Sequence, residues 1–367
     1  MDRILQIAVA NDRGGLTGYI VNNYRKINRK EFQFDFITYD DKLDFSDEVE
    51  KMGAKIFYLP RPSHVVAYYR ALKTIQKQFD YLAVHFNLSY VNIVPILLAK
   101  MAGFKRIIVH SHSTGIDDPS TIIRMIKITI HHIGKQLLPL LATDCFACSK
   151  LAARWMFPNN IIKNNKYEVL YNSIDLSKFR FEQQKRDKIR KLLGIADDVF
   201  VIGHVGRFTY QKNHEFLIDV FQEIKTREPN SILLLVGDGP DREKIEKQVI
   251  SYGLFDKVKF LGQRSDVADL YQAMDVLVLP SRFEGLCIVA IEAQMAALPN
   301  VCSEVLPEET KVSSDYTSLS LTLSAKEWAD KVLEKKGINR KDNTEILRLA
   351  GYDADEEIKR LENLYNS

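Results

Sequence analysis

The chain has 367 residues, of which 46% are hydrophobic and 27% are charged, and its net charge is +3. This composition is typical of a folded globular protein and excludes a disordered chain. The net charge is too small to indicate nucleic acid as a partner.

Because one hydrophobic core rarely grows beyond about 250–300 residues, the length predicts two domains. No apolar run approaches the roughly 20 residues that a membrane-spanning helix needs. Residues 1–12 read as a first strand rather than a signal peptide, and four cysteines are too few for a disulfide framework. We therefore expect a cytoplasmic protein, with peripheral contact at the inner face of the plasma membrane left open.

In the first half, short apolar runs alternate with helical patterns, as expected for a parallel sheet that is covered on both faces. Helical patterns span residues 65–78 and 91–102, for example. The predicted strands are residues 3–10, 32–39, 80–86, 105–112 and 144–149. The alternation stops before a polar, basic stretch at 183–191, which reads as a solvated linker and helix rather than a binding patch. We predict a first domain at 1–172 and a solvated linker at 173–195.

The alternation restarts after the linker, which predicts a second α/β domain at 196–352. A last helical pattern at 353–367 follows the strands of this domain. It could cover either domain, and we assign it to the first. The predicted strands of the second domain are residues 200–208, 231–239, 257–262, 275–281 and 299–304.

The stretch SRFEGLCIVAIEAQMAALP, residues 281–299, places two carboxylates at the start of an apolar helix. An ionised Glu292 inside such a helix is costly unless hydrogen-bond donors or a cation compensate it. The paired hydroxyls of a ribose would do so, and Glu284 in the preceding loop could bind sugar hydroxyls. The N–H groups at the helix start favour a phosphate. The alternative is a salt-bridged Glu292, with Glu284 as an ordinary N-terminal charge.

Two cations follow the first strand of the second domain, in GHVGRFTYQKN. Arg207 and Lys212 would neutralise a diphosphate at the carboxyl edge of the sheet, where ligands of such sheets bind. The alternative is a pair of solvated surface residues. In the first domain, Gly14 and Gly15 follow the first strand. They would let the backbone approach a ligand closely, or they form a structural turn.

The strand at 105–112 ends with His110 and His112, which strand alternation places on one face. No third ligand with suitable spacing follows, so zinc is not expected. One or both histidines would hydrogen-bond a substrate, and the alternative is a satisfied structural role.

The segment 119–141 combines a broad apolar face with the cations Arg124, Lys127 and Lys135. Such a helix could rest on anionic lipid. The alternative is a helix that packs its apolar face on the sheet of the first domain.

The order and spacing of these segments resemble the retaining glycosyltransferases of family 4, which have the GT-B fold. The similarity covers nearly the whole chain. It is closest to the bacterial branch that builds exopolysaccharide or capsular polysaccharide, through stretches such as HVGRFTYQKNHEFLIDVF and AMDVLVLPSRFEGL. The resemblance implies an α/β protein with two Rossmann-like parallel-sheet domains that face each other across a cleft. The first would bind the acceptor and the second the nucleotide-sugar donor.

The resemblance also implies roles for individual residues. Glu284 would bind hydroxyls of the donor sugar, Glu292 the ribose, and Arg207 and Lys212 the diphosphate. Gly15 would approach the diphosphate from the other domain. The other residues that it assigns are His112 near the transferred sugar, the backbone of Gln263 and Arg264 near the base, and Gly14, Gly285, Leu286, Cys287 and Ile288 in the donor site.

The sequence departs from the family pattern at three positions. Cys287 stands where a proline is common, and Ala297 and Ser173 replace usual glycines. The change at Cys287 predicts a differently shaped sugar pocket.

We thus predict an enzyme that moves a sugar from a nucleotide diphosphate donor, a UDP-sugar, to a hydroxyl of a growing polysaccharide with retention of configuration. His112, Arg207, Lys212 and Glu284 are the expected catalytic residues. The resemblance suggests a lipid-linked acceptor. No metal or cofactor is expected, because cations and helix N–H groups would stabilise the leaving diphosphate. Two alternatives stay open: a non-catalytic sugar-nucleotide-binding scaffold and a GT-B epimerase.

Overall fold

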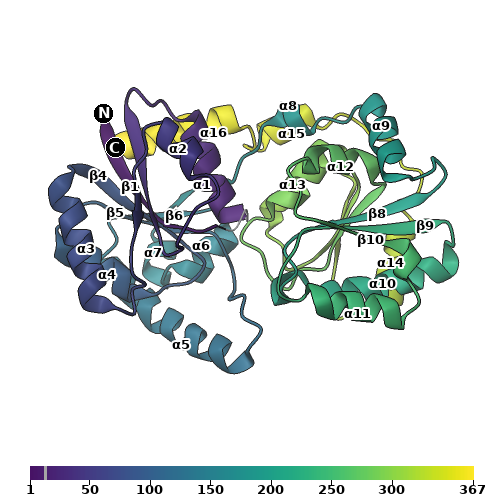
Figure 1. The fold of residues 1–367 in the computed structure, drawn as a ribbon, viewed down its shortest axis with the longest axis horizontal. Coiled ribbons are helices and arrows are strands. Elements are labelled where there is room, and N and C mark those ends of the chain that lie inside the picture. The colour runs from purple at the N-terminus through teal and green to yellow at the C-terminus, as the bar shows by residue number, and fades with distance from the viewer. Residues whose placement is uncertain (12–14) are drawn as a thin grey trace. The chain divides into compact units, whose positions relative to one another are not determined.

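The computed structural model describes residues 1–11 and 15–367, and their contacts divide the chain into two compact units (Figure 1). Unit 1 comprises residues 1–116, 120–172 and 355–367. Unit 2 comprises residues 117–119 and 173–354.

Unit 1 is built on a parallel sheet, which has seven strands within the described residues. The strand order is β3-β2-β1-β4-β5-β6-β7. All seven residues of β2 are buried, as expected for a strand that is covered on both faces. The strands are β1 (Asp2–Val9), β2 (Phe32–Thr38), β3 (Ile56–Tyr58), β4 (Tyr81–Leu88), β5 (Ile107–Ser111), β6 (Asp144–Ala147) and β7 (Glu168–Val169).

The helices of unit 1 follow the strands and cover both faces of the sheet (Figure 1). Side-chain caps fix several helix starts: Asn92 accepts from the N–H of Val94, and Ser149 accepts from that of Ala152. The helices are α1 (Gly15–Lys26), α2 (Ser46–Lys51), α3 (Val65–Gln78), α4 (Ile93–Ala102), α5 (Thr121–Leu137), the 3₁₀ turn η1 (Leu138–Leu140), α6 (Lys150–Met156), α7 (Asn159–Lys163) and α16 (Ala354–Asn366).

The C-terminal helix α16 completes the core of unit 1 although it follows unit 2 in the chain. Its residues Ile358, Leu361 and Tyr365 join a buried cluster with the aromatic side chains of β2. The Tyr365 hydroxyl lies 2.9 Å from Nδ1 of His85. The guanidinium of Arg106 donates to the carbonyl oxygens of Leu364 and Tyr365, two groups of the last turn that lack a partner within the helix.

Unit 2 contains a second parallel sheet, with six strands in the described part of the chain. The strand order is β10-β9-β8-β11-β12-β13. The strands are β8 (Phe200–Val205), β9 (Ser231–Val236), β10 (Val258–Gly262), β11 (Val276–Leu279), β12 (Asn300–Ser303) and β13 (Tyr316–Leu319). Two Rossmann-like sheets, as the sequence predicts, are therefore present.

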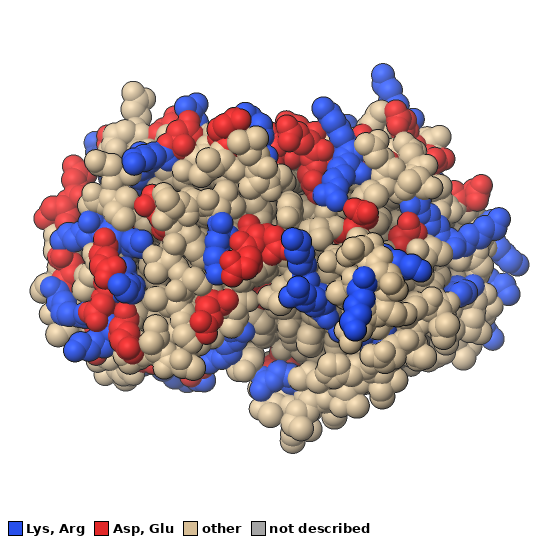
Figure 2. Space-filling view, turned by 180° about the vertical axis from the view of Figure 1, so that it is seen from behind, with Lys and Arg blue, Asp and Glu red and all other residues tan. Residues whose placement is uncertain are grey.

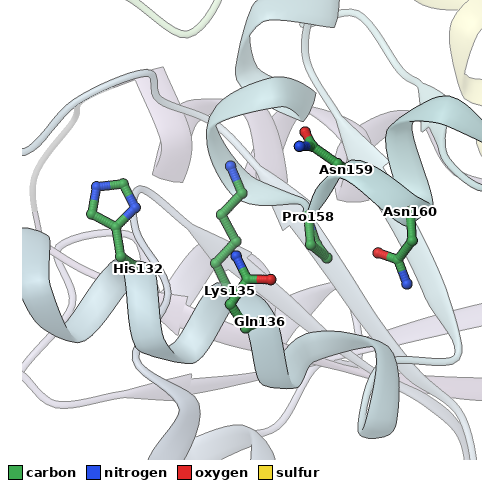
Figure 3. A pocket seen from close by; sticks show the side chains of 6 residues that line it. All are labelled: His132, Lys135, Gln136, Pro158, Asn159 and Asn160. Atoms are coloured by element: carbon green, nitrogen blue, oxygen red, sulfur yellow. The ribbon is translucent and has the colours of Figure 1, made fainter.

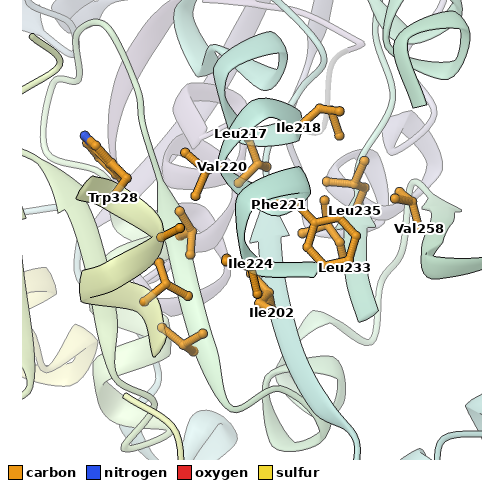
Figure 4. Close-up of a cluster of buried hydrophobic side chains, with 14 of the residues drawn as sticks. Ile202, Leu217, Ile218, Val220, Phe221, Ile224, Leu233, Leu235, Val258 and Trp328 are labelled. Atoms are coloured by element: carbon orange, nitrogen blue, oxygen red, sulfur yellow. The ribbon is translucent and has the colours of Figure 1, made fainter. Parts of the chain in front are cut away.

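The core of unit 2 forms where α10 and α14 pack on β8 and β9 (Figure 4). Phe221 and Ile224 of α10 lie there with the fully buried Trp328 of α14. The helices are α8 (Leu176–Phe179), α9 (Gln183–Leu193), α10 (His214–Arg227), α11 (Arg242–Ser251), α12 (Val267–Ala273), α13 (Ile288–Met295), α14 (Ala325–Leu333) and α15 (Thr344–Leu349), with the 3₁₀ turns η2 (Tyr210–Lys212), η3 (Phe255–Lys257) and η4 (Glu308–Thr310).

The segment 173–195, which the sequence assigns to a linker, groups with unit 2, and its basic stretch forms the predicted helix. Its helix α9 packs on α12. Arg186 donates to the carbonyl oxygen of Met274 and pairs with Asp275 at 2.6 Å, and Arg190 is buried. Arg186 thus satisfies carbonyl groups at the end of α12, and Arg190 donates to the carbonyl oxygens of Asp197 and Val199.

Three strands, β3, β7 and β13, are absent from the sequence prediction. They have three, two and four residues, which is too short for a clear apolar alternation. Within residues 1–11 and 15–367, no helix is long and apolar enough to cross a bilayer.

Candidate functional site

Helix α13 carries a carboxylate in an apolar environment, at the carboxyl end of β11. Ala290, Ile291 and Ala293 are buried, while Glu292 between them keeps partial exposure. The helix begins at Ile288, so Glu292 lies about one turn inside it. Among the described residues Glu292 forms no salt bridge, and its hydrogen bond comes from the Tyr271 hydroxyl at 2.9 Å.

The protonation of Glu292 reflects this environment. Burial raises the pKa of the Glu292 carboxyl to about 7, while the Tyr271 hydroxyl and the more distant Lys178 oppose the increase. A pKa this high means that the ionised carboxylate of Glu292 receives too few hydrogen bonds to offset its burial. Additional hydroxyl donors would stabilise the carboxylate, and a ribose provides two.

A close ion pair involves Glu284, which lies in the loop between β11 and α13. Nζ of Lys212 is 2.6 Å from Oε1 of Glu284, and both side chains are largely buried. Gln211 donates from Nε2 to the other carboxylate oxygen at 3.1 Å. Burial disfavours the charged Lys212, but Glu284 outweighs this effect and raises the pKa of the ammonium. The structure thus joins two of the residues that the sequence predicts for the site.

A hydrogen bond fixes the loop between β11 and α13, and the start of α13 has no side-chain cap. Thr310 donates to the carbonyl oxygen of Leu286 at 2.5 Å. Cys287, which is buried, adopts φ +67° and caps α13 without a side-chain hydrogen bond. Gly285 is buried and Ile288 half-buried. The N–H groups of the first turn, which have no side-chain cap, therefore remain suited to an anion.

Arg207 is exposed and lines a pocket of about 200 Å³ in unit 2, together with Thr209, Tyr210 and Asp241. The stem of Lys212 runs beside Gly206, where an added Cβ would lie 3.1 Å from its Cδ. The two predicted cations therefore lie at the same sheet edge, one buried and paired, one at the surface.

The loop after β10 carries Gln263 and Arg264, and both are exposed. The Arg264 guanidinium forms two hydrogen bonds with the carboxylate of Asp266, at 2.7 and 2.6 Å. Their predicted place near a base stays a prediction.

In unit 1, the predicted histidines form an uncharged cluster at the end of β5. The ring centroids of His110 and His112 are 4.0 Å apart, and Nδ1 of His110 lies 3.3 Å from Nε2 of His85. Burial lowers the pKa of His85 and His112 to about 3 and that of His110 well below its ordinary value. His110 is fully buried, whereas His112 keeps partial exposure. That one or both histidines hydrogen-bond a substrate stays a prediction.

His112 has the geometry of a hydrogen-bond acceptor. Its Nε2 lies 3.0 Å from Oδ1 of Asn87, whose Nδ2 donates to Gln6, so Nε2 carries the proton. Its Nδ1 has no hydrogen-bond partner among the described residues. A neutral imidazole with an unused lone pair can accept a hydrogen bond from a hydroxyl.

Gly15 is exposed at the first position of α1, and a Cβ added there would meet nothing within 4 Å. Neither packing nor a positive φ requires a glycine at this position. Gly14 lies outside the described residues.

Sequence reasoning missed three residues of these sites: Tyr271, Gln211 and Asn87. Each acts by a contact between elements that are distant in the chain. Tyr271 and Asn87 lie outside the quoted motifs, whereas Gln211 lies within GHVGRFTYQKN but has no charge that would single it out. Within the described ranges, no group of three or more His, Cys, Asp or Glu side chains is arranged to hold a metal ion.

Comparison with known proteins gives matches to both units. A model of "Glycosyltransferase Family 4" matches residues 13–178, and a model of "Glycosyl transferases group 1" matches residues 185–335. EpsF of Bacillus subtilis, whose name is that of a glycosyltransferase, is 31% identical over 99% of this chain and 96% of its own. The capsular polysaccharide biosynthesis glycosyltransferase CapH of Staphylococcus aureus is 24% identical over 100% and 99%.

The solved structure of HepE from Anabaena, in complex with UDP and glucose, superimposes with a TM-score of 0.79. Its sequence is 18% identical, and the match covers 100% of both chains. This likeness shows that the chain has the same fold.

Proposed function

The chain belongs to the family 4 glycosyltransferases, which have the GT-B fold, and from this premise we propose that it transfers a sugar from a UDP-sugar to a hydroxyl of a growing polysaccharide, with retention of configuration. Donor binding is assigned to the carboxyl edge of the unit 2 sheet.

The observation that carries this proposal is the environment of Glu292. Its carboxylate lies in an apolar helix, receives one hydrogen bond from Tyr271, and has a pKa of about 7. Two ribose hydroxyls would donate to it and stabilise the ionised form, since hydrogen bonds to charged groups contribute about 1.5–3 kcal/mol each.

The ion pair of Lys212 and Glu284 provides two complementary contacts for the donor. The ammonium binds the diphosphate, and the carboxylate accepts from hydroxyls of the sugar. As the glycosidic bond breaks, negative charge develops on the diphosphate. Lys212, Arg207 and the N–H groups at the start of α13 stabilise that charge.

The relatives support the donor and acceptor classes. HepE was solved with UDP and glucose, and CapH is named for capsular polysaccharide biosynthesis. The names of the relatives favour transfer over epimerisation or a scaffold role. Product analysis separates the three: transfer gives UDP and an extended acceptor, epimerisation gives an isomeric UDP-sugar, and a scaffold gives neither.

The site is tested by the substitution Glu292→Ala, with UDP affinity measured by titration calorimetry at pH 8. We expect a loss of about 10- to 100-fold, because hydrogen bonds to a charged group are removed. Glu243→Ala, at an exposed glutamate of α11 that pairs with Lys247, is the control and should bind UDP as the wild type does. Unchanged UDP affinity in folded Glu292→Ala protein would contradict the ribose assignment.

The pKa of Glu292 adds a pH-dependence. The free carboxyl is half-protonated near pH 7, and UDP binds the ionised form, so UDP affinity should decrease as the pH falls below 7. Binding at pH 7 should release protons, which calorimetry in buffers of different ionisation enthalpy detects. In Glu292→Gln protein the proton release should disappear; its persistence would assign the titration to another group.

A further inference from the structure

Helix α5 exposes a continuous apolar stripe. Five aliphatic side chains recur at intervals of three or four residues, so they lie on one side of the helix. Each is between 41% and 73% exposed. They are Ile122, Ile126, Ile130, Ile133 and Leu137, and we call them the α5 stripe.

The opposite side of α5 attaches the helix to unit 1 through polar contacts. His131 is buried, accepts from the N–H of Val91 and stacks on Trp155 with ring centroids 4.0 Å apart. Gly134 lies so close to Val91 that an added Cβ would be 2.7 Å from it. Lys135 donates to the carbonyl oxygens of residues 154 and 155. The interpretation that α5 packs its apolar face on the sheet is therefore wrong.

Neighbouring elements extend the apolar surface beyond the stripe. Leu97 and Met101 of α4 and Leu140 after α5 are also exposed. Nζ of Lys100 donates to the carbonyl oxygen of Leu140 at 2.6 Å, which ties α4 to this end of α5. Figure 2 shows the projection at its lower edge, where α5 lies, as almost entirely tan. Large contiguous apolar surfaces of this kind mark interaction sites.

Positive charge is concentrated in the same part of the chain. Residues 119–167, which include α5, α6 and α7, hold seven Lys or Arg and one Asp or Glu, a net charge of +6. The whole chain carries only +3, so all other residues together are net negative. The apolar stripe thus lies in a strongly basic segment of an otherwise acidic protein.

A polar pocket of about 350 Å³ borders the stripe (Figure 3). His132, Lys135 and Gln136 of α5 line one side, and Asn159 and Asn160 of α7 line the other. Helix geometry places His132 and Gln136 beside the stripe rather than on it. Donor groups therefore lie next to apolar side chains, as the boundary between headgroups and acyl chains requires.

We propose that the α5 stripe inserts into the surface of an anionic lipid bilayer, with cations of the basic segment 119–167 at the headgroups. Aliphatic side chains gain free energy by leaving water for acyl chains, and the basic segment is attracted to anionic lipid. Nucleic acid would engage the cations but offers no apolar surface for five aliphatic side chains. This binding is independent of the proposed function, and it would bring the enzyme to a lipid-linked acceptor.

The test is flotation of the full-length protein with vesicles of phosphatidylcholine alone or mixed with phosphatidylglycerol. The wild type should bind the phosphatidylglycerol vesicles and detach when salt rises from about 0.1 M to about 1 M, since the screening length falls from about 10 Å to about 3 Å. The triple variant Ile126→Ser, Ile130→Ser, Ile133→Ser should bind roughly tenfold or more weakly, because the apolar contact is lost.

A matched variant separates the α5 stripe from general surface hydrophobicity. Leu192, Ile250 and Leu349 of unit 2 are 72%, 61% and 79% exposed, so replacing all three by Ser removes comparable apolar surface. This control should bind vesicles as the wild type does. Because the stripe side chains are exposed, the triple variant should keep its melting temperature and its UDP affinity.

Three outcomes would overturn the proposal. One is a wild type that does not bind phosphatidylglycerol vesicles. Another is a stripe variant that binds them as tightly as the wild type does. The third is a wild-type dimer that dissociates in the stripe variant without any vesicle binding, which would assign the stripe to a second copy of the chain. Vesicle binding without UDP binding would leave the proposal intact and count against the proposed function instead.

Discussion

The two units place different chemistry at the same position of the same architecture. At the carboxyl edge of its parallel sheet, unit 2 has the ion pair of Lys212 and Glu284 and the carboxyl of Glu292. At the corresponding edge, unit 1 has neutral histidines that are hydrogen-bonded to Asn87 and to one another. One edge is suited to a charged ligand, and the other to hydroxyl groups.

This difference arises from burial and pairing, not from residue type alone. All of these groups are largely removed from water, which disfavours the charged form of each. Lys212 stays charged because a carboxylate lies 2.6 Å away, whereas His112 is hydrogen-bonded to a neutral amide oxygen and stays neutral. In the same type of fold, one neighbouring side chain thus decides whether a buried group is charged or neutral.

The largest effect is expected from Lys212→Ala, which removes the ammonium of the buried ion pair in unit 2. Turnover should decrease by about 10²–10³-fold, because one donor to the developing charge is lost. The free energy of unfolding should decrease by about 3–5 kcal/mol, because Glu284 is left buried without its cation. Single-turnover kinetics and thermal melting measure the two effects.

A double variant separates these two losses. Lys212→Met with Glu284→Gln removes both charges, so it should recover stability but not turnover. Recovery of both would show that the ion pair is structural only.

A smaller effect is expected from His112→Gln in unit 1. The Gln amide can replace Nε2 as the donor to Asn87 but does not supply the lone pair of Nδ1. Transfer should fall about tenfold, as expected for one neutral hydrogen bond, with UDP affinity unchanged. Weakened UDP binding would contradict the division of labour between the units.

The low pKa of His112 also has a consequence for stability. The unfolded chain takes up a proton near pH 6.5, whereas the folded site does so only near pH 3. The contribution to stability is therefore full above pH 6.5 and is lost as the pH falls toward 3. His112→Gln should reduce this acid sensitivity.

The smallest effect on stability is expected from Gly15→Ala. Space is open around this position, so the melting temperature should stay nearly constant, whereas an approaching ligand would meet the new methyl group and turnover should fall. Gly237→Ala in unit 2 is the contrasting control, since its φ is +133° and its Cβ would lie 2.1 Å from the carbonyl oxygen of Gly206. Normal turnover in Gly15→Ala protein would remove Gly15 from the site.

Local patterns in the sequence predict both sheets and the position of the unit 2 site. Long apolar runs identify the central strands, and the placement of Glu284 and Glu292 around a helix start follows from the strand, loop and helix order. Partners that come from other elements are not predictable in this way. Tyr271 of α12 donates to Glu292 of α13, and no spacing in the chain encodes that contact.

Helix α5 shows a further limit of sequence patterns. Its periodicity identifies an apolar face but not whether that face points inward. The buried face is set by Gly134 and His131, whose close contacts with Val91 and Trp155 depend on residues elsewhere in unit 1. The same periodicity therefore fits an internal helix and a surface helix.

Helix α16 imposes an order on the assembly of the protein. Tyr365 fills the unit 1 core and bonds to His85, yet a ribosome releases it only after every residue of unit 2. During synthesis, unit 1 therefore lacks part of its hydrophobic core until all residues of unit 2 have been made. Truncation near the C-terminus should accordingly damage the half of the protein that was synthesised first.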